Sequence, residues 1–369
     1  MTRFSAADRA YMADALRLAW RGRYGAHPNP MVGCVLVRDD EVVGRGWHAR
    51  AGEAHAEINA LAEAGDSASG ATAYVTLEPC SHHGKTAPCV GALVAAGVSR
   101  VVAAMRDPFP RVAGSGFETL TEHGVDVSFG LFEAEARTLN VGYLSRVERK
   151  RPRVTLKIAA SVDGATAMAS GESQWITAAA ARRDVQRLRA RSGAIMTGVA
   201  TVIADNPSLT VREDFGGVEN LAQPLRAVLD SELRAPESAR LLALPGETII
   251  YSREGGDQRS IPGATVQPVA ADGQRVSLLA VLADLAEREV NDVLIEAGAT
   301  LAGAALAAGI VDQVVIYQAP HMMGSETRPM LRTPELLTLG SRFALEVEDL
   351  RRIGADWRIT ATPVIAAGG

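Results

Sequence analysis

The chain has 369 residues, 47% of them hydrophobic and 22% charged, which is enough apolar material for two domains or one large domain. Its net charge of −5 argues against a broad nucleic-acid interface, because such an interface favours a basic surface. No apolar stretch reaches the length of a membrane span, and the charged N-terminus lacks the apolar core of a secretion signal.

The N-terminal part of the chain alternates expected strands and helices. Ser5 followed by Asp8 is typical of a helix N-terminus, and the Asp39-Asp40 pair indicates a turn between two strands. Strands are expected at residues 31–37, 41–46, 71–77, 98–104 and 125–129, and helices at residues 54–64 and 88–96. This alternation predicts a mixed sheet with helices on both faces.

One histidine, one glutamate and two cysteines follow one another here with a pattern typical of zinc deaminases. His55 and Glu57 form an H-x-E triplet, and Cys80 and Cys89 each follow a proline. One imidazole and two thiolates leave the fourth tetrahedral position of zinc open for water, whose pKa zinc lowers to about 7. We therefore expect His55, Cys80 and Cys89 to bind zinc, and Glu57 to transfer protons without binding it.

Other interpretations of these residues are possible. Alone, His55 would be interpreted as a satisfied helix-face histidine and the cysteines as small apolar residues, but the set as a whole favours zinc. Eight residues separate Cys80 from Cys89, which departs from the P-C-x-x-C pattern, although a polar loop that contains glycine can still close the site. A structural zinc site usually has four protein ligands, so a set of three argues against one.

The third cysteine lies outside this set. Cys34 stands in the apolar run 32–37, so we expect a buried small residue rather than a redox centre. With two of the three cysteines assigned to zinc, no disulfide framework is indicated, and this favours a reducing, cytoplasmic location.

A domain boundary is expected in the charged segment 147–153, which contains a proline, precedes a new strand and is interpreted as a solvated linker. This predicts one domain over residues 1–148 and a second over residues 149–369. In the second domain, strands are expected at residues 154–160, 194–198, 225–230, 247–251, 292–296 and 313–319, and a helix at residues 182–191.

A glycine-containing turn at residues 298–304 follows one of these strands and opens a helix. Its backbone amides could hold a phosphate, or its glycines could serve only close packing, and the residues leave both open. The sequence has no G-x-G-x-x-G motif, so a Rossmann dinucleotide site is not supported.

Motifs in both halves carry a family resemblance: residues 27–34, 55–57 and 76–86, then residues 157–164, 171–177, 201–212 and 296–298. They closely resemble the bifunctional riboflavin-biosynthesis deaminase/reductases. The resemblance implies a cytidine-deaminase-like three-layer α/β/α domain followed by a dihydrofolate-reductase-like α/β domain. It also implies a zinc-dependent deamination of a phosphoribosylated diaminopyrimidine, and then a reduction of the ribosyl group to ribityl that uses NADPH.

The resemblance implies contacts for individual residues. In the deaminase half, substrate contacts would fall on Asn29, His48, His82 and Lys85. In the reductase half, they would fall on Ser173, Arg189, Leu209, Arg212 and Glu296. The NADPH contacts would fall on Ala159, Trp175, Thr201, Asp205, Ser231, Gly298, Ala299, Thr300, Leu301, Ala302, Gly303 and Ala304.

Some of these residues have a second interpretation. We expect Lys157 and Glu296 to polarise the sugar and assist its ring opening, although a strand-end lysine paired with a glutamate can also be structural. Arg189 and Arg212 suit a phosphate ester because guanidinium presents a planar fork of donors, but each alone could be a surface ion-pair partner. Lys85 is the expected phosphate partner in the deaminase half, or else a solvated loop lysine.

Two further functions are compatible with parts of the chain. A nucleic-acid-editing deaminase would share the zinc motif, but the acidic balance argues against it. Alternatively, the second half could be a nucleotide-binding or dimerisation module, which consumption of NADPH would exclude. The expected partner is a small phosphorylated pyrimidine rather than nucleic acid or membrane, and a homo-oligomer, either a dimer or a tetramer, is compatible with the resemblance.

Overall fold

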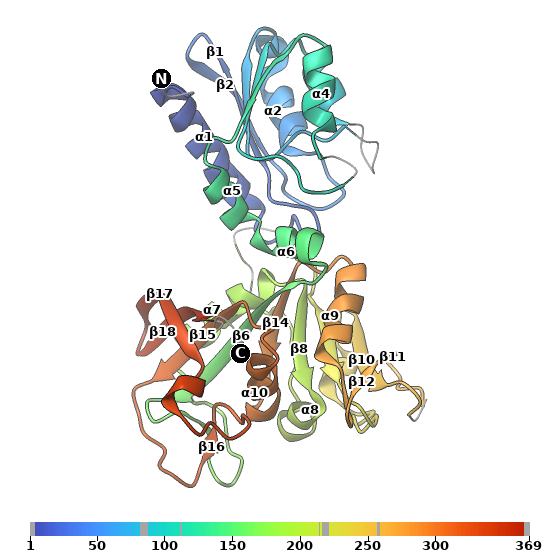
Figure 1. Cartoon of the computed structure of the whole chain (residues 1–369), viewed down its shortest axis with the longest axis vertical. Coiled ribbons are helices and arrows are strands. Elements are labelled where there is room, and N and C mark those ends of the chain that lie inside the picture. The colour runs from blue at the N-terminus through green and yellow to red at the C-terminus, as the bar shows by residue number, and fades with distance from the viewer. Residues whose placement is uncertain are drawn as a thin grey trace. The chain divides into compact units, whose positions relative to one another are not determined.

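The computed structural model describes residues 4–81, 88–110, 113–213, 215, 221–256 and 259–364. The chain divides into two compact units, Met1–Lys150 and Arg151–Gly369, whose elements are labelled in Figure 1. Each unit has its own sheet and its own apolar clusters, which are what an independently folding domain requires.

The N-terminal unit is built on a five-stranded mixed sheet with the strand order β2-β1-β3-β4-β5. β1 pairs antiparallel with β2 and β3, whereas β3, β4 and β5 run parallel. All five strands overlap the predicted ranges, so the mixed sheet is confirmed. They span β1 Gly33–Arg38, β2 Glu41–Trp47, β3 Thr72–Val75, β4 Arg100–Ala103 and β5 Asp126–Phe129.

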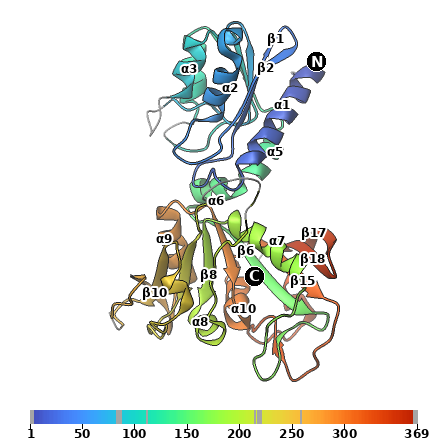
Figure 2. The same cartoon turned by 180° about the vertical axis from the view of Figure 1, so that it is seen from behind.

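Helices cover both faces of this sheet, as predicted (Figures 1 and 2). Both faces need helices because the side chains of β1 alternate between two apolar clusters. Val35 and Val37 lie in the first cluster, and Cys34 and Leu36 lie in the second. The first cluster packs under α1 Ala6–Ala19, α5 Glu133–Leu139 and α6 Val141–Arg149, and the second under α2 Ala56–Ala64, α3 Cys89–Ala95 and α4 Ser115–Glu122. Short 3-10 helices occupy Trp20–Gly22 and Gly65–Ala68.

Helix α1 begins where the sequence predicts it. Ser5 Oγ accepts a hydrogen bond from the Asp8 amide at 3.0 Å, and the Asp8 carboxylate accepts one from the Ser5 amide at 2.8 Å. Tyr74 and Arg100 also donate to Asp8, each at 2.8 Å, which ties the helix to β3 and β4. Burial alone would raise the pKa of Asp8, but these hydrogen bonds hold it well below its usual range.

A glycine on β2 allows helix α2 to lie directly against the sheet. A Cβ atom at Gly46 would lie 2.0 Å from the backbone oxygen of Ala56, the first residue of the helix. A larger residue there would push the helix away and displace His55, its N-cap, together with Glu57 in its first turn. The close approach therefore fixes the position of the predicted zinc and proton-transfer residues.

The C-terminal unit contains a nine-stranded sheet with the order β11-β10-β9-β8-β14-β6-β15-β18-β17. The strands from β11 to β15 in this order run parallel, and β18 and β17 add an antiparallel pair at one edge. They span β6 Arg153–Ser161, β8 Ala194–Gly198, β9 Leu225–Leu229, β10 Thr248–Arg253, β11 Thr265–Val269, β14 Asp292–Glu296, β15 Gln313–Ala319, β17 Ala344–Ile353 and β18 Asp356–Val364.

One small hairpin, one short two-stranded pairing and, in the described part of this unit, four helices complete it. The hairpin joins β12 Ala271–Asp272 and β13 Arg275–Val276, and the other pairing brings β7 Ala165–Ala167 beside β16 Arg328–Pro329, far along the chain. α9 Leu278–Glu287 and α10 Ala299–Ala307 pack on one face of the sheet, and α7 Ala179–Ala190 and α8 Val199–Asp205 on the other. Short 3-10 helices lie at Arg240–Ala243 and Leu339–Ser341. The carboxyl ends of the parallel strands share one edge, so the segments that follow them gather there.

The predicted linker at residues 147–153 is wrong in its first part. Helix α6 continues to Arg149, because Val147 is buried in the apolar cluster of the N-terminal unit. Arg151 is also not a solvated linker residue, since its guanidinium donates two 2.9 Å hydrogen bonds to the carboxylate of Asp312 in the C-terminal unit. Among the described residues, no helix has the length and apolar character needed to cross a lipid bilayer.

Candidate functional site

Three predicted zinc ligands converge in the N-terminal unit. His55 is the N-cap of α2, Cys89 is the first residue of α3, and Cys80 lies in the segment that follows β3. Their ligand atoms all lie within 4.8 Å of one another. The Nδ1 atom of His55 is 3.3 Å from Cys89 Sγ and 3.6 Å from Cys80 Sγ.

These separations fit a tetrahedral zinc ion. Zinc–nitrogen bonds of about 2.0 Å and zinc–sulfur bonds of about 2.3 Å at tetrahedral angles place a nitrogen and a sulfur ligand about 3.5 Å apart. The two observed separations, 3.3 and 3.6 Å, lie on either side of that value. Contacts with Cys89 and His55 also lower the pKa of the Cys80 thiol to about 4, which favours the thiolate that binds metal.

Glu57 lies beside this cluster without belonging to the ligand set. Its side chain is buried, and its carboxyl group interacts with the Cys89 thiol. Burial, and then the charge of Cys80, raises the pKa of Glu57 to about 7. A carboxyl group that titrates near neutral pH can both accept and release a proton, although a bound dication would lower this value.

Two of the four predicted substrate residues of this half lie next to each other. Asn29 Nδ2 is 3.0 Å from His48 Nε2, and His48 Nδ1 is 3.2 Å from the backbone oxygen of Ala54. The His48 ring packs edge-on against His55, with the ring centroids 5.2 Å apart. The other two, His82 and Lys85, lie outside the residues that the structure describes.

Two positioning residues were not identified from the sequence. The buried Glu78 carboxylate accepts hydrogen bonds of 2.9 Å from the amides of Gly114 and Gly116, which holds the start of α4 beside the Cys80 segment. The buried Asn140 side chain pairs with both backbone groups of Met31, at 2.7 and 3.0 Å, and so holds the loop that carries Asn29. Neither pattern is local, so no spacing in the sequence could have indicated the pairing.

In the C-terminal unit, a cavity of about 1280 Å³ opens at the carboxyl edge of the sheet. It gathers the predicted residues from distant parts of the chain. The predicted residues that line it are Lys157, Ala159, Ser173, Trp175, Arg189, Thr201, Asp205, Leu209, Arg212, Ser231, Glu296, Gly298, Ala299, Thr300, Leu301 and Ala304.

Two predicted cofactor residues do not line this cavity. Ala302 and Gly303 are buried on the inner side of α10. A Cβ atom at Gly303 would lie 1.9 Å from the backbone oxygen of Arg332, so this glycine serves close packing. Of the two interpretations of the 298–304 turn, packing therefore applies to these residues, while the turn from Gly298 to Leu301 faces the cavity.

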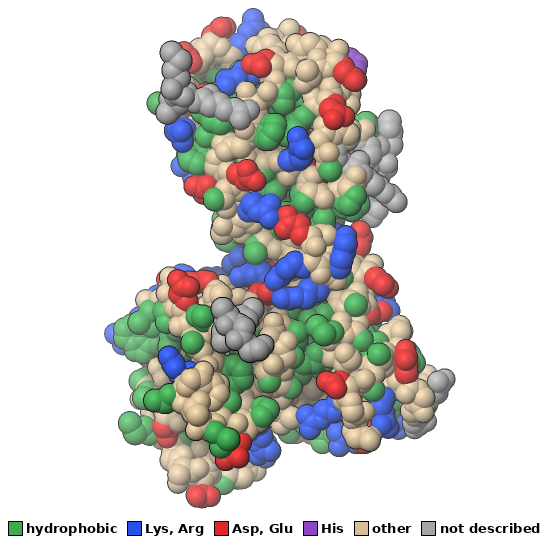
Figure 3. Space-filling model, in the orientation of Figure 1, with side chains coloured by type: hydrophobic (Ala, Val, Ile, Leu, Met, Phe, Trp, Pro, Cys, Tyr) green, Lys and Arg blue, Asp and Glu red, His purple; other side chains and the backbone are tan. Residues whose placement is uncertain are grey.

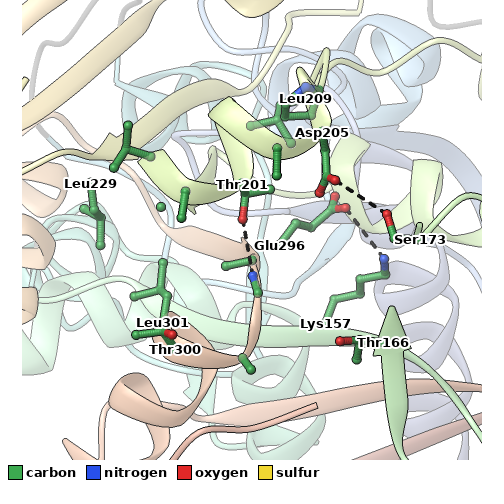
Figure 4. A pocket seen from close by; sticks show the side chains of 18 of the residues that line it. Lys157, Thr166, Ser173, Thr201, Asp205, Leu209, Leu229, Glu296, Thr300 and Leu301 are labelled. Atoms are coloured by element: carbon green, nitrogen blue, oxygen red, sulfur yellow. Dashed lines mark hydrogen bonds and ion pairs between the residues drawn. The ribbon is translucent and has the colours of Figure 1, made fainter. Parts of the chain in front are cut away.

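A largely enclosed cluster of charges forms the floor of the cavity. Glu296, at the end of β14, accepts hydrogen bonds from Arg189 Nε at 2.6 Å and from a terminal nitrogen of Arg189 at 3.0 Å. Lys157 Nζ lies 3.8 Å from the same carboxylate, as Figure 4 shows. Burial alone would raise the pKa of Glu296, but Arg189 and Lys157 lower it to about 2. Because Glu296 occupies its fork, Arg189 is not available as the phosphate ligand that the sequence suggested.

The remaining polar residues stand around this floor. The Ser173 hydroxyl points toward the Asp205 carboxylate at 3.5 Å, and Thr201 Oγ1 accepts from the Gly298 amide at 3.4 Å (Figure 4). The Trp175 ring is 64% exposed, and the Arg182 guanidinium lies 4.5 Å above its centre. An exposed aromatic ring at a cavity mouth is suited to stacking on a flat heterocycle.

The charge of the lining fits a ligand that carries several phosphates. It contains nine cations, Lys157 and eight arginines, against the four carboxylates of Asp205, Glu232, Asp272 and Glu296. Since Glu296 is already paired, the excess of positive charge is available to anions, and the volume is large enough for a dinucleotide beside a second ligand. The cavity therefore fits NADPH together with a phosphorylated substrate.

Comparison with known proteins gives these sites a family. Residues 152–359 match the model of the RibD C-terminal domain, and residues 5–105 match that of the cytidine and deoxycytidylate deaminase zinc-binding region. The riboflavin biosynthesis protein RibD of Escherichia coli (strain K12) is 50% identical over 359 residues, covering 95% of this chain and 97% of the relative. The chain belongs to the RibD family.

Other members support this assignment over the same length. The RibD protein of Haemophilus influenzae is 43% identical over 371 residues and covers 98% of this chain and 99% of its own length. The structure of Acinetobacter baumannii RibD superposes with a TM-score of 0.91 at 42% identity, covering 97% and 99% of the two chains. A Thermotoga maritima structure, named as a diaminohydroxyphosphoribosylaminopyrimidine deaminase/5-amino-6-(5-phosphoribosylamino)uracil reductase, superposes with a TM-score of 0.85 at 30% identity, with the same coverage.

Membership of the RibD family makes the chain a bifunctional deaminase/reductase of riboflavin biosynthesis that acts on small molecules. It confirms the cytidine-deaminase-like fold of the first domain and the dihydrofolate-reductase-like fold of the second. The deaminase domain has a zinc-binding region, which is where His55, Cys80 and Cys89 converge, and the reductase domain uses NADPH.

Proposed function

We propose that this chain deaminates 2,5-diamino-6-(5-phosphoribosylamino)pyrimidin-4-one and then reduces the ribosyl group of the product, 5-amino-6-(5-phosphoribosylamino)uracil, to ribityl. The convergence of His55, Cys80 and Cys89 beside the buried Glu57 carries the first step. The cationic cavity around Glu296 supports the second. The name of the Thermotoga maritima relative supports this choice of substrates.

In the deamination, water adds to the amine-bearing pyrimidine carbon and ammonia leaves. Zinc, when bound, supplies an open position at which a water molecule has a pKa of about 7. Glu57 would take a proton from the attacking water and give it to the departing amine, a role supported by its burial beside the three predicted ligands. Asn29 and His48 hydrogen-bond to the pyrimidine, and we propose that His82 and Lys85 complete the substrate site, with Lys85 on the phosphate.

In the reduction, the ring-opened sugar accepts a hydride at C1′, and NADPH, when bound, supplies that hydride. Glu296 stays ionised at neutral pH because its pKa is about 2, so it cannot donate a proton. We therefore assign proton donation in ring opening to Lys157 and electrostatic stabilisation to Glu296. Arg189 holds Glu296 in place, while the exposed Arg212 provides a cation for the substrate phosphate.

The remaining assignments concern the whole molecule. We propose that the N-terminal unit, Met1–Lys150, performs the deamination and that the C-terminal unit, Arg151–Gly369, with NADPH at the predicted contacts, performs the reduction. We also propose a homo-oligomer in the cytoplasm, where a reducing environment keeps the two zinc-binding thiols free to bind metal. Sedimentation of the full chain tests the oligomer, and a monomer at micromolar concentration would contradict it.

A coupled assay tests the proposed function. Zinc-loaded protein receives the diaminopyrimidine substrate and NADPH, and both ammonia release and nicotinamide absorbance are followed. We expect ammonia first and NADPH oxidation only after it, with a ribityl product. Ammonia without NADPH oxidation, even when deaminated intermediate is added, would leave the C-terminal unit as a binding module and contradict the second step.

A further inference from the structure

The order of the strands gives the NADPH cavity a direction. β6 carries Lys157, and its neighbour β14 ends at Glu296, with these two residues paired in register. Helix α10 starts after β14, and Ser231 follows β9, two strands further along the sheet. Adjacent strands lie about 4.8 Å apart, so the cavity extends about 10 Å from the Glu296 end to the Ser231 end.

This direction determines where each part of the cofactor lies. The nicotinamide must lie near Lys157 and Glu296, because the sugar that accepts the hydride lies there. The backbone amides at the start of α10 face the cavity next, where they suit the pyrophosphate. The adenosine must then extend toward Ser231. NADPH differs from NADH only by the 2′-phosphate on this adenosine, so discrimination between the two has to occur at the Ser231 end.

A hairpin closes this end of the cavity. The Val276 amide of β13 donates a 3.0 Å hydrogen bond to Ser231 Oγ, which fixes the hairpin against the loop that follows β9. Arg253 donates a 2.6 Å hydrogen bond to the Gln274 side chain and so holds the hairpin turn. Arg275, which lies between Gln274 and Val276 in the chain, lines the cavity.

Two guanidinium groups at this end lack a strong partner. Within the described part of the chain, no hydrogen bond or ion pair engages the Arg275 side chain. Arg234 lines the same end, and its ion pair with Glu232, 3.5 Å long with side chains 58% and 61% exposed, is of the weak surface kind. Figure 3 shows Lys and Arg side chains gathered over the part of this unit where Figure 1 labels β10 and β12.

We propose that Arg275 and Arg234, together with the Ser231 hydroxyl, form the binding site for the 2′-phosphate of NADPH and give the enzyme its preference for NADPH over NADH. The phosphate is an anion of nearly two charges, and a guanidinium fork matches its oxygens. Ser231 Oγ accepts a hydrogen bond from Val276, which leaves its own proton to donate. The inference rests on the proposed reductase function and assigns the residues that select its cofactor.

The test is steady-state reduction of the deaminated substrate with NADPH and with NADH, for Arg275→Gln and Arg234→Gln. We expect Arg275→Gln to raise the KM for NADPH about tenfold, the size of a lost charge-assisted hydrogen bond, and to leave the KM for NADH within about twofold. Both positions are exposed, so the variants should fold. Arg352→Gln removes the same charge from an exposed position on β17 outside the cavity and should change neither KM.

A binding measurement separates this inference from the proposed function. Adenosine 2′,5′-bisphosphate should bind the wild-type chain more tightly than adenosine 5′-monophosphate, and Arg275→Gln should reduce that difference about tenfold. If the wild-type chain oxidises neither cofactor, the proposed reductase function fails. If it oxidises NADPH, while both variants keep the wild-type ratio of the two KM values and the wild-type nucleotide preference, the 2′-phosphate site is elsewhere.

Discussion

The charge cluster beneath the reductase cavity allows a quantitative prediction for Glu296→Gln. Glu296 and Arg189 have side chains only 10% and 11% exposed, and Lys157 is 17% exposed. The substitution keeps the shape of the side chain but leaves the two cations without their counter-ion. Breaking one side of a buried ion pair in this way typically costs about 3–5 kcal/mol.

The titration of Glu296 gives an independent magnitude. Its pKa falls from an ordinary value of 4.5 to about 2, and each pKa unit corresponds to about 1.4 kcal/mol, so the folded state gains about 3 kcal/mol from the ionised carboxylate. Because the folded pKa is the lower one, this stabilisation is complete above pH 4.5 and is lost as the pH falls toward 2. About 1 kcal/mol of it is lost by pH 4.

Urea unfolding of the full chain, followed by hydrogen exchange of peptides from β14 and β6, measures the stability of the C-terminal unit by itself. We expect Glu296→Gln to be less stable than wild type by about 3 kcal/mol at pH 7. The difference should shrink by about 1 kcal/mol at pH 4, because only the wild-type carboxyl titrates. If wild type and Glu296→Gln were equally stable at pH 7, or if their difference in stability did not change with pH, the carboxylate would not be the stabilising partner of these cations.

Three further predictions concern single residues. Glu57→Gln should lower deamination by about 10²–10⁴-fold while one zinc per chain is retained, and loss of zinc with the activity would instead make Glu57 a ligand. Cys89→Ser should release zinc and abolish ammonia production but leave NADPH oxidation of added intermediate intact, which metal analysis and the coupled assay check. Gly303→Ala should destabilise the C-terminal unit by about 1–3 kcal/mol, because its Cβ would meet the Arg332 backbone at 1.9 Å. Gly91→Ala, in open space on helix α3, is the matched control and should stabilise its own unit by about 1 kcal/mol.

The sequence was sufficient to predict elements and ligands whose signal is a short motif or a regular apolar pattern. Ser5 and Asp8 predict the start of α1, and the apolar run at residues 194–198 predicts β8 to the residue. The proposed zinc ligands could be named because zinc requires particular atoms at particular spacings. The triplet containing His55 and the two Pro-Cys pairs carry that requirement in the order of the residues.

The sequence could not predict contacts between residues that lie far apart along the chain. Arg189 and Glu296 are separated by 107 positions, and nothing in either segment shows that the guanidinium fork is already occupied. The inward turn of Ala302 and Gly303 depends on how α10 packs against a later segment. The β17–β18 hairpin was missed because many of its side chains are exposed, so it lacks the apolar pattern that identifies a buried strand.

In the proposed mechanism the two sites use glutamates in opposite ways, and the difference follows from their neighbours. Glu57 is buried next to thiols, so without a bound metal burial dominates and raises its pKa to about 7. Glu296 is largely enclosed as well, but Arg189 and Lys157 outweigh burial and hold its pKa at about 2, where it stays an anion at neutral pH. Hydrolysis of an amine requires a group that gains and loses a proton in each cycle. In the proposed reduction, a fixed negative charge beside the proton donor would stabilise positive charge on the ring-opened sugar, so the same type of side chain would serve both proposed roles because its surroundings differ.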